Sequence, residues 1–217
     1  MNMKIKIKHA PLLLLALLLS ACHSAWITNL AVASGQVLYK DDFSDPTSGW
    51  PRLAGSNGMT DYVDGSYRIL VLVPGYNLWA QPGQYFGEVQ VEADATVLNG
   101  PAINRFGLVC RYQDQQDYSF FIISSDGYYA IGKTVKGVTS LLGQDSMAHT
   151  NAILPGAGPY HLRFDCTSTT LAGYVNGQAL ALINDADSSG GDVGLIAGTF
   201  LTPGVDVSFD DFMVTKP

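Results

Sequence analysis

Apolar and polar residues alternate with a period of two along most of the chain from Val37 onward. Residues 88–95 show the pattern most cleanly, because polar side chains there alternate with small apolar ones, and residues 160–166 repeat it with larger apolar side chains. Such alternation is typical of half-buried antiparallel strands, and no segment beyond Val37 carries a sustained helical period. We therefore expect an all-β fold of about a dozen short strands, arranged as a sandwich or jelly roll.

The segment 106–112 predicts a strand whose two faces lie in different surroundings. Strict alternation divides its residues into an inward set and an opposite set, which are Phe106, Leu108, Cys110 and Tyr112 on the one hand and Val109 and Arg111 on the other.

Three dipeptides between the alternating runs predict tight hairpin turns: Asp64-Gly65, Asp126-Gly127 and Asn176-Gly177. Each supplies residues that tolerate the positive φ that such turns require.

The first residues have the features of an export signal. Lys4, Lys6 and Lys8 precede an apolar run over residues 11–19, which is too short for a permanent membrane span. The run ends in Leu19-Ser20-Ala21-Cys22, which resembles the bacterial lipobox. The resemblance implies that residues 1–21 are a signal peptide and that Cys22 carries the lipid. The alternative is an ordinary export signal followed by a chance cysteine.

Charge and length limit what the exported part can do. The chain has 12 basic and 19 acidic residues, and removing the three lysines of the signal leaves nine basic residues and a net charge of about −10. So acidic a surface repels phosphate backbones, which excludes general nucleic-acid binding. We expect residues 22–36 to form a lipidated tether and residues 37–217 to form one domain. The protein is then extracytoplasmic and lipid-anchored to the cell membrane or outer membrane.

The cysteines are consistent with export. With Cys22 lipidated, Cys110 and Cys166 remain as an even pair in an oxidising compartment. Each lies toward the end of an apolar strand face, so both point into the same interior. We predict a disulfide between them, against the alternative of two buried free thiols.

Several segments, in order, resemble concanavalin A-like jelly rolls. They are residues 38–45 with Ser48-Gly49-Trp50 for the first strand, residues 106–112, 118–120 and 126–129 for the central hairpin, residues 174–177 and 190–195, and residues 208–212 for the closing strand. The resemblance is nearest to the LamG-like group and to bacterial domains labelled 3-keto-disaccharide hydrolase. It implies two curved antiparallel sheets and a concave face that often binds glycans.

The acidic pair Glu88 and Glu92 is the candidate for catalysis. Glycosidases of this fold carry Glu-x-Asp-x-Glu on one strand, but Gln90 stands here in the middle position. Retaining hydrolysis needs carboxylates about 5 Å apart, whereas positions i and i+4 of a strand are about 13 Å apart. The alternative is a solvated face, or pairing of the glutamates with Arg111 and Arg163.

Calcium is the one cofactor the sequence suggests. Asp42 and Asp45 lie near the first strand and Asp210 lies on the last, and jelly-roll modules often bring these ends together around a structural Ca²⁺. The alternative is that these aspartates stabilise turns at strand ends.

Aromatic residues could stack on sugar rings, since each offers a flat apolar face with a polar edge. The candidates are Trp50, Trp79, Tyr112, Tyr118, Tyr128 and Tyr129. We expect Glu92, Arg111 and Arg163 to meet on one sheet surface, with Trp79 at its rim and Tyr128 on a neighbouring loop. The sequence thus favours a non-catalytic glycan-binding module. A glycoside hydrolase using Glu88 and Glu92, or a structural or protein-interaction domain of the cell envelope, are the alternatives.

Overall fold

The computed structural model describes residues 35–156, 158–186 and 190–217. All of them belong to one compact unit. The predicted signal peptide, the lipid attachment at Cys22 and nearly all of the predicted tether lie outside the described residues. Within the described part of the chain, no helix is long and apolar enough to cross a membrane.

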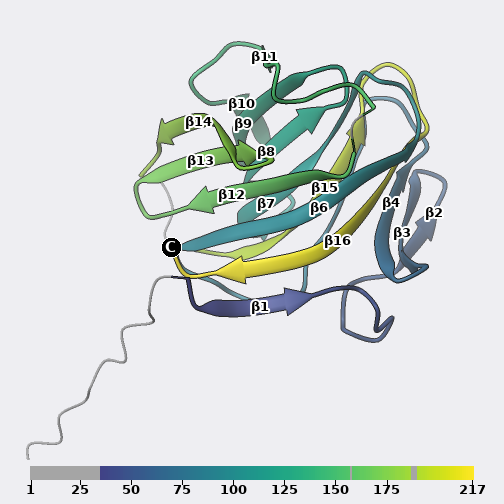
Figure 1. The fold of residues 1–217 in the computed structure, drawn as a ribbon, viewed down its shortest axis with the longest axis horizontal. Helices are drawn as coiled ribbons and strands as arrows, with labels where there is room; N and C mark the ends of the chain where they lie inside the picture. Colours follow the sequence, from purple (N-terminus) through teal and green to yellow (C-terminus); the bar gives the residue numbers. More distant parts are fainter. Residues whose placement is uncertain (1–34, 157, 187–189) are drawn as a thin grey trace, which may run out of the picture. The chain divides into compact units, whose positions relative to one another are not determined.

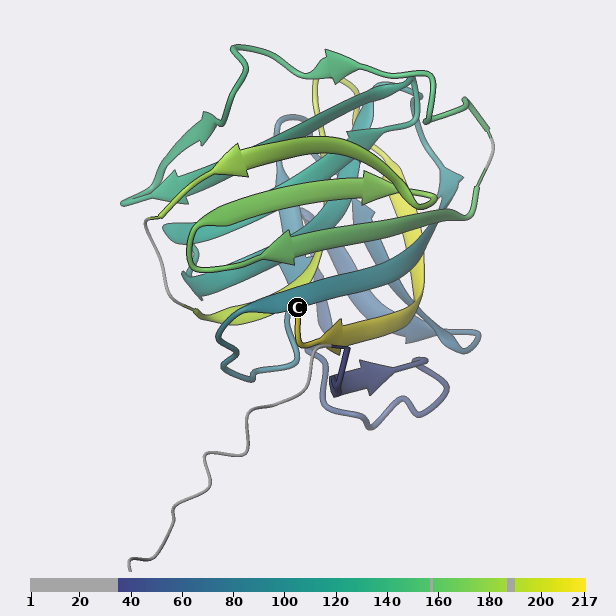
Figure 2. The ribbon, with the colours of Figure 1, turned by 60° about the vertical axis from the view of Figure 1, so that its left-hand side comes forward.

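Two antiparallel sheets make up the described domain (Figures 1 and 2). Sheet A has nine strands, in the order β14-β13-β12-β6-β16-β4-β3-β2 with β1 paired to β16. Their bounds are β1 Val37–Asp41, β2 Leu53–Gly55, β3 Gly58–Val63, β4 Ser66–Val71, β6 Val89–Asn99, β12 Tyr160–Cys166, β13 Thr170–Val175, β14 Gln178–Asn184 and β16 Val205–Thr215.

Sheet B has seven strands, in the order β10-β9-β8-β7-β15-β5 with β11 paired to β9. Their bounds are β5 Asn77–Ala80, β7 Asn104–Asp114, β8 Asp117–Ser124, β9 Tyr128–Val135, β10 Val138–Leu141, β11 Ala148–His149 and β15 Asp192–Thr199. The predicted all-β sandwich is confirmed. Strands that are distant in sequence, such as β6 and β16, lie side by side.

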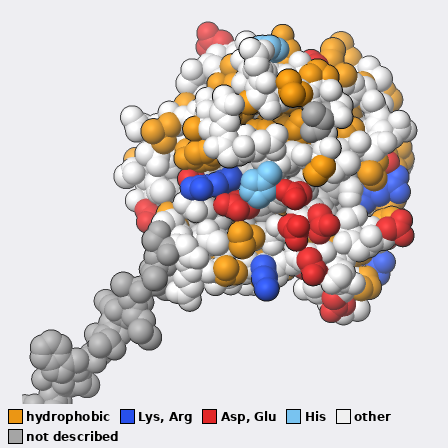
Figure 3. Space-filling model, in the orientation of Figure 1, with side chains coloured by type: hydrophobic (Ala, Val, Ile, Leu, Met, Phe, Trp, Pro, Cys, Tyr) orange, Lys and Arg blue, Asp and Glu red, His pale blue; other side chains and the backbone are white. Residues whose placement is uncertain are grey.

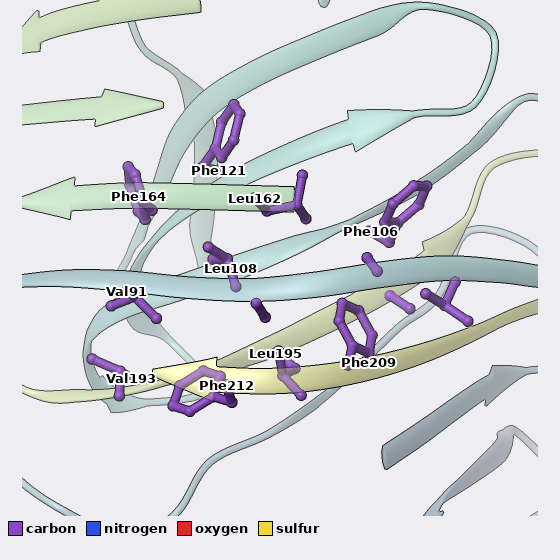
Figure 4. Packing of buried hydrophobic residues seen from close by; sticks show 14 of the residues in the cluster. Val91, Phe106, Leu108, Phe121, Leu162, Phe164, Val193, Leu195, Phe209 and Phe212 are labelled. Carbon is purple, nitrogen blue, oxygen red and sulfur yellow. The ribbon is translucent and has the colours of Figure 1, made fainter. Parts of the chain in front are cut away.

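The core lies between the two sheets (Figure 4). Val91 and Phe164 from sheet A meet Leu108, Phe121 and Leu195 from sheet B, and the rings of Phe121 and Phe164 lie 5.9 Å apart. Because alternate residues of β6 and β12 enter this layer, the period of two in these segments corresponds to burial of one face of sheet A. In sheet B, β8 is buried on both faces over most of its length.

The predicted disulfide is confirmed. Cys110 of β7 is bonded to Cys166 of β12, with the two Cα atoms 6.6 Å apart. Since β7 belongs to sheet B and β12 to sheet A, the bond links the two layers covalently through the core.

The strict alternation predicted for residues 106–112 is wrong at its end. Arg111 has a φ of +53°, and the pairing of β7 with β8 shifts register after Cys110. On the other side of β7, Tyr112 pairs with Asp192 and Val109 pairs with Gly194, so β7 contains one extra residue. Such a β-bulge reverses the faces beyond it. Tyr112 therefore packs on the outer face beside Val109 and not in the core with Cys110.

The three predicted turns join consecutive strands. Asp64-Gly65 joins β3 to β4 and Asn176-Gly177 joins β13 to β14, each with positive φ at both residues. Asp126-Gly127 joins β8 to β9, and there only the glycine has positive φ.

The two ends of the domain meet at sheet A. Val37 of β1 pairs with Thr215 of β16. The backbone of Gly35 donates a hydrogen bond to the carbonyl of Lys216, and Lys216 donates one to the carbonyl of Gln36.

Candidate functional site

Four aromatic side chains form a surface, here called the aromatic platform, on the outer face of sheet B. They are Trp79 of β5, Tyr112 of β7, and Tyr118 and Phe120 of β8. The ring centroids of Trp79 and Tyr112 lie 5.9 and 6.0 Å from that of Tyr118, with planes inclined by 32° and 35°. Trp79 Nε1 also donates to the Tyr112 hydroxyl at 3.4 Å. The bulge at Arg111 makes this possible, because it directs Tyr112 outward.

Two hollows adjoin the platform, and Tyr118 lines both. The larger, the polar hollow, has a volume of about 430 Å³ and is lined by Arg111, Gln113, Asp117, Tyr118, Ser119, Lys133, Thr134, Val135 and Asp185. The smaller, the apolar hollow, has a volume of about 150 Å³ and is lined by Asn77, Arg105, Tyr118, Phe120, Ile122, Thr139, Leu141, Met147, Ile196 and Phe200. Because Tyr118 lines both, the two hollows are adjacent, and we call the two hollows with the platform beside them the groove.

An ion-pair network closes one side of the polar hollow. Arg111 Nη1 lies 2.9 Å from Asp185 Oδ2, and Lys133 Nζ lies 3.0 Å from Asp185 Oδ1. Arg111 also donates to the backbone carbonyls of Thr167 and Asp185, both in segments that extend from sheet A. The guanidinium of Arg111 therefore joins sheet B to sheet A. Of the two cations that bind Asp185, Lys133 is more exposed than Arg111.

Tyr128 lies on the sheet B side as well. It is half exposed on β9, and its ring meets that of His149 edge to face at 5.3 Å. It lines a shallow hollow with Met147 and Phe200, two residues that also line the apolar hollow. Trp50 and Tyr129, by contrast, face the core, and Tyr129 donates its hydroxyl to the carbonyl of Leu180.

The predicted meeting of Glu92 and Arg163 with Arg111 on one sheet is wrong. Glu92 and Arg163 are register partners on β6 and β12 of sheet A, with Arg163 Nε 3.9 Å from Glu92 Oε1, whereas Arg111 belongs to sheet B. Arg163 binds Asp165 more closely, at 2.6 and 2.8 Å, and its guanidinium lies over the ring of Tyr174. Trp79 lies near Arg111 and not near the Glu92–Arg163 pair.

The outer face of sheet A carries an acidic hollow of about 510 Å³. Figure 3 shows acidic side chains gathered over β6 and β16, with a histidine beside them. The lining residues are Lys40, Asp41, Asp42, Glu92, Asp94, His161, Asp211, Phe212 and Met213. His161 Nδ1 lies 2.7 Å from Asp94 Oδ1. Burial, together with nearby Asp211, Asp42 and Asp94, raises the pKa of Asp210 at its margin.

Neighbouring residues already bind both glutamates. Glu88 accepts a hydrogen bond from the backbone of Ser168 at 2.7 Å, and the side chain and backbone of Ser168 lower the pKa of Glu88. That shift is opposite to the one a general acid needs. Glu92 lies between His161 and Arg163, at 3.6 and 3.9 Å. Glu88 and Glu92 thus interact with residues of β12 or of the turn that follows it.

The predicted calcium ligands stabilise turns. Asp42 accepts hydrogen bonds from the backbone and hydroxyl of Ser44, and Asp45 accepts the same pair from Thr47. Asp210 accepts from the backbone of Asp211. Among the described residues, no three His, Cys, Asp or Glu side chains come together as a metal site.

Sequence reasoning missed Asn77, Arg105 and Phe200, which line the apolar hollow. Arg105 could have been found, because it lies two residues before Gly107 and four before Val109, on the outward face of β7. Asn77 and Phe200 carry no such signal, since their positions depend on the pairing of β5 with β15.

Comparisons with known proteins agree with this architecture. No family model matches the chain, and no curated protein sequence matches it. Among solved structures, carbohydrate-binding module CBM66 from Bacillus subtilis is 15% identical, with a TM-score of 0.63 over 77% of this chain and 96% of that one. A Bacillus subtilis protein with a galectin-like fold is 13% identical, with a TM-score of 0.64 over 85% and 97%. Bacillus licheniformis β-glucanase is 11% identical, with a TM-score of 0.59 over 82% and 97%. At such identities the likeness shows the fold alone, and the chain has the concanavalin A-like jelly-roll fold.

Proposed function

We propose that this protein is a lipid-anchored, non-catalytic carbohydrate-binding module whose site is the groove on the outer face of sheet B. The aromatic platform carries the proposal. Trp79 and Tyr112 are half-buried, which leaves part of each ring free to stack on the apolar face of a sugar. The polar hollow beside them supplies Gln113, Lys133 and other groups for sugar hydroxyls.

The sheet A face supports binding less well. The hollow on this face is lined mainly by carboxylates. His161 and the neighbouring Arg163 already contact acidic side chains, Asp94 and Asp165. The comparisons are consistent with a binding module, because CBM66 is named as a carbohydrate-binding module and shares the fold. They are equally consistent with hydrolases, so the choice rests on geometry: Glu88 accepts a hydrogen bond from the backbone of Ser168, and Glu92 lies between His161 and Arg163.

A glycan array probed with the purified protein, followed by isothermal titration, tests the proposal. Trp79→Ala is expected to weaken binding of the selected glycan at least tenfold, because stacking area is lost while the fold stays intact. Tyr174→Ala is the matched control, since Tyr174 is a half-buried aromatic on the outer face of sheet A. Loss of binding in Tyr174→Ala with full binding in Trp79→Ala would place the site on sheet A and overturn the proposal.

Incubation of the bound glycan with the protein tests the absence of catalysis. A binding module returns the glycan intact, and no new reducing ends form. Release of product that disappears in Glu88→Gln would instead identify a glycoside hydrolase.

A further inference from the structure

Arg105 differs from the other arginines of the chain in its surroundings. Four of the five contact an aspartate, in the pairs Arg52–Asp61, Arg68–Asp206, Arg111–Asp185 and Arg163–Asp165. Arg105 makes no ion pair with any described residue, and the apolar hollow that it lines contains no carboxylate. Its charge is therefore not compensated by an anion in this pocket, whose other lining residues are neutral.

Arg105 Nε is buried and has no hydrogen-bond acceptor among the described residues, and Asn77 Oδ1 is buried without a donor. The two groups flank Gly198 of β15, where a Cβ atom would clash with both of them. Glycine at this position thus lets the side chains of Asn77 and Arg105 lie close against β15, beside the hollow that both residues line.

The guanidinium of the half-buried Arg105 is stacked on an aromatic ring. It lies over the ring of Phe200, 4.7 Å from the centroid, and burial lowers the pKa of Arg105. Burying a cation without a partner costs free energy. The ring of Phe200 offsets part of this cost, but no anion among the described residues compensates the charge, which is the situation expected of a group that binds a charged ligand.

We propose that the apolar hollow binds the carboxylate of an acidic sugar, a uronic acid residue of a glycan that lies along the groove. This inference rests on the proposed function and specifies its ligand. The carboxylate accepts hydrogen bonds from the Arg105 guanidinium, which suits planar bidentate acceptors. A neutral hydroxyl could also accept from the guanidinium, but it would leave the charge of Arg105 uncompensated.

The size and position of the hollow fit this ligand. Its 150 Å³ is about ten times the ~15 Å³ that one water molecule needs, so it holds a carboxyl group with the adjoining ring atoms. Tyr118 lines it and also contacts Trp79, so a sugar with its carboxylate at Arg105 has the aromatic platform beside it.

The test is isothermal titration of the purified protein with oligogalacturonate, oligomannuronate and glucuronate-containing oligosaccharides. Each is compared with the same glycan after its carboxylates have been reduced to primary alcohols. We expect at least one acidic glycan to bind at least tenfold more tightly than its reduced form. Arg105→Gln is expected to abolish that difference, and Arg105→Lys to restore part of it. The control Arg52→Gln, on an exposed pair of sheet A, should retain it.

Stability supplies a readout that does not depend on the ligand. Arg105→Met removes an uncompensated charge from an apolar pocket and is expected to leave the melting temperature unchanged or raise it. A lower melting temperature in Arg105→Met would indicate a structural role and overturn the inference.

The outcomes separate the two proposals. Equal binding of acidic and reduced glycans, with dependence on Trp79, overturns the carboxylate site and leaves the module intact. Undiminished binding of the acidic glycan by Arg105→Gln has the same meaning. Failure to bind any glycan, acidic or neutral, overturns both.

Discussion

Arg111 and Asp185 form a buried ion pair that joins the bulge of β7 to the segment after β14, with Nη1 and Oδ2 2.9 Å apart. Both side chains are more than nine-tenths buried, so neither charge is compensated by water. The pair links sheet B to sheet A at the same bulge that directs Tyr112 outward to the aromatic platform.

Arg111→Ala is expected to lower the free energy of unfolding by about 3 kcal/mol, because it leaves Asp185 buried with Lys133 alone. Urea denaturation followed by tryptophan fluorescence measures the change. Arg52→Ala is the control, since its exposed pair with Asp61 should contribute less than about 1 kcal/mol. Equal effects of the two substitutions would contradict a special role for the buried pair.

The Cys110–Cys166 disulfide closes a loop with a sequence separation of 56 residues. In the chain-entropy model, a loop of this length stabilises the folded state by about 4 kcal/mol. The double variant Cys110→Ala/Cys166→Ala should therefore unfold at a markedly lower urea concentration than the parent. The parent in reducing buffer should approach the behaviour of the variant. A midpoint that is the same for all three would refute this contribution.

Asp210→Asn should stabilise the protein at pH 7 and have no effect near pH 3. Burial and three neighbouring carboxylates raise the pKa of Asp210 in the folded state. The folded state then binds the proton more readily than the unfolded state, so stability falls as pH rises from the ordinary value of 3.8 through the raised value. The gain at pH 7 should be about 0.5 kcal/mol and should shrink in 1 M salt.

Asp45→Asn is the control, because its effect on stability at pH 7 should have the opposite sign to that of Asp210→Asn. Hydrogen bonds from Thr47 lower the pKa of Asp45, so its contribution to stability is present above the unfolded value and lost as pH falls. The substitution should destabilise at pH 7. Thermal melts of both variants between pH 3 and 7 measure these slopes, and two slopes of the same sign would contradict the interpretation.

The proposed lipid anchor depends on Cys22. Cys22→Ser is expected to release the protein from membranes or to block its processing, because the serine hydroxyl does not replace the acylated thiol. Fractionation and metabolic labelling with a radioactive fatty acid check this. Unchanged labelling and membrane association in Cys22→Ser would remove the anchor from the proposal.

Local pattern was enough to predict the fold and the disulfide. Burial of one sheet face imposes the period of two, and that period also placed Cys110 and Cys166 on inward faces. The candidate site was predicted less well. The bulge at Arg111 moved Tyr112 to the other face, and β7 ends at Asp114, so too few residues follow the bulge to reveal the changed phase of the alternation.

Pairing between distant strands was the second difficulty. Whether Arg111 shares a sheet with Arg163 depends on which strands become neighbours, and alternation within a strand contains no information about its partner. For the same reason, the convergence of Asn77 on Arg105 could not be predicted, because it requires β15 to lie between β5 and β7.

The pairing of β1 with the end of β16 has a practical consequence. Gly35 and Lys216 are hydrogen-bonded neighbours, so the polypeptide enters and leaves the sandwich at one point. A short linker could join these positions, and new ends could be opened at the exposed Lys136-Gly137 turn between β9 and β10. By the same geometry, the domain could be inserted as a unit into a surface loop of a host protein. Such an insertion would separate the two sides of the host loop very little, and the groove, which neither Gly35 nor Lys216 lines, would remain uncovered by the junction.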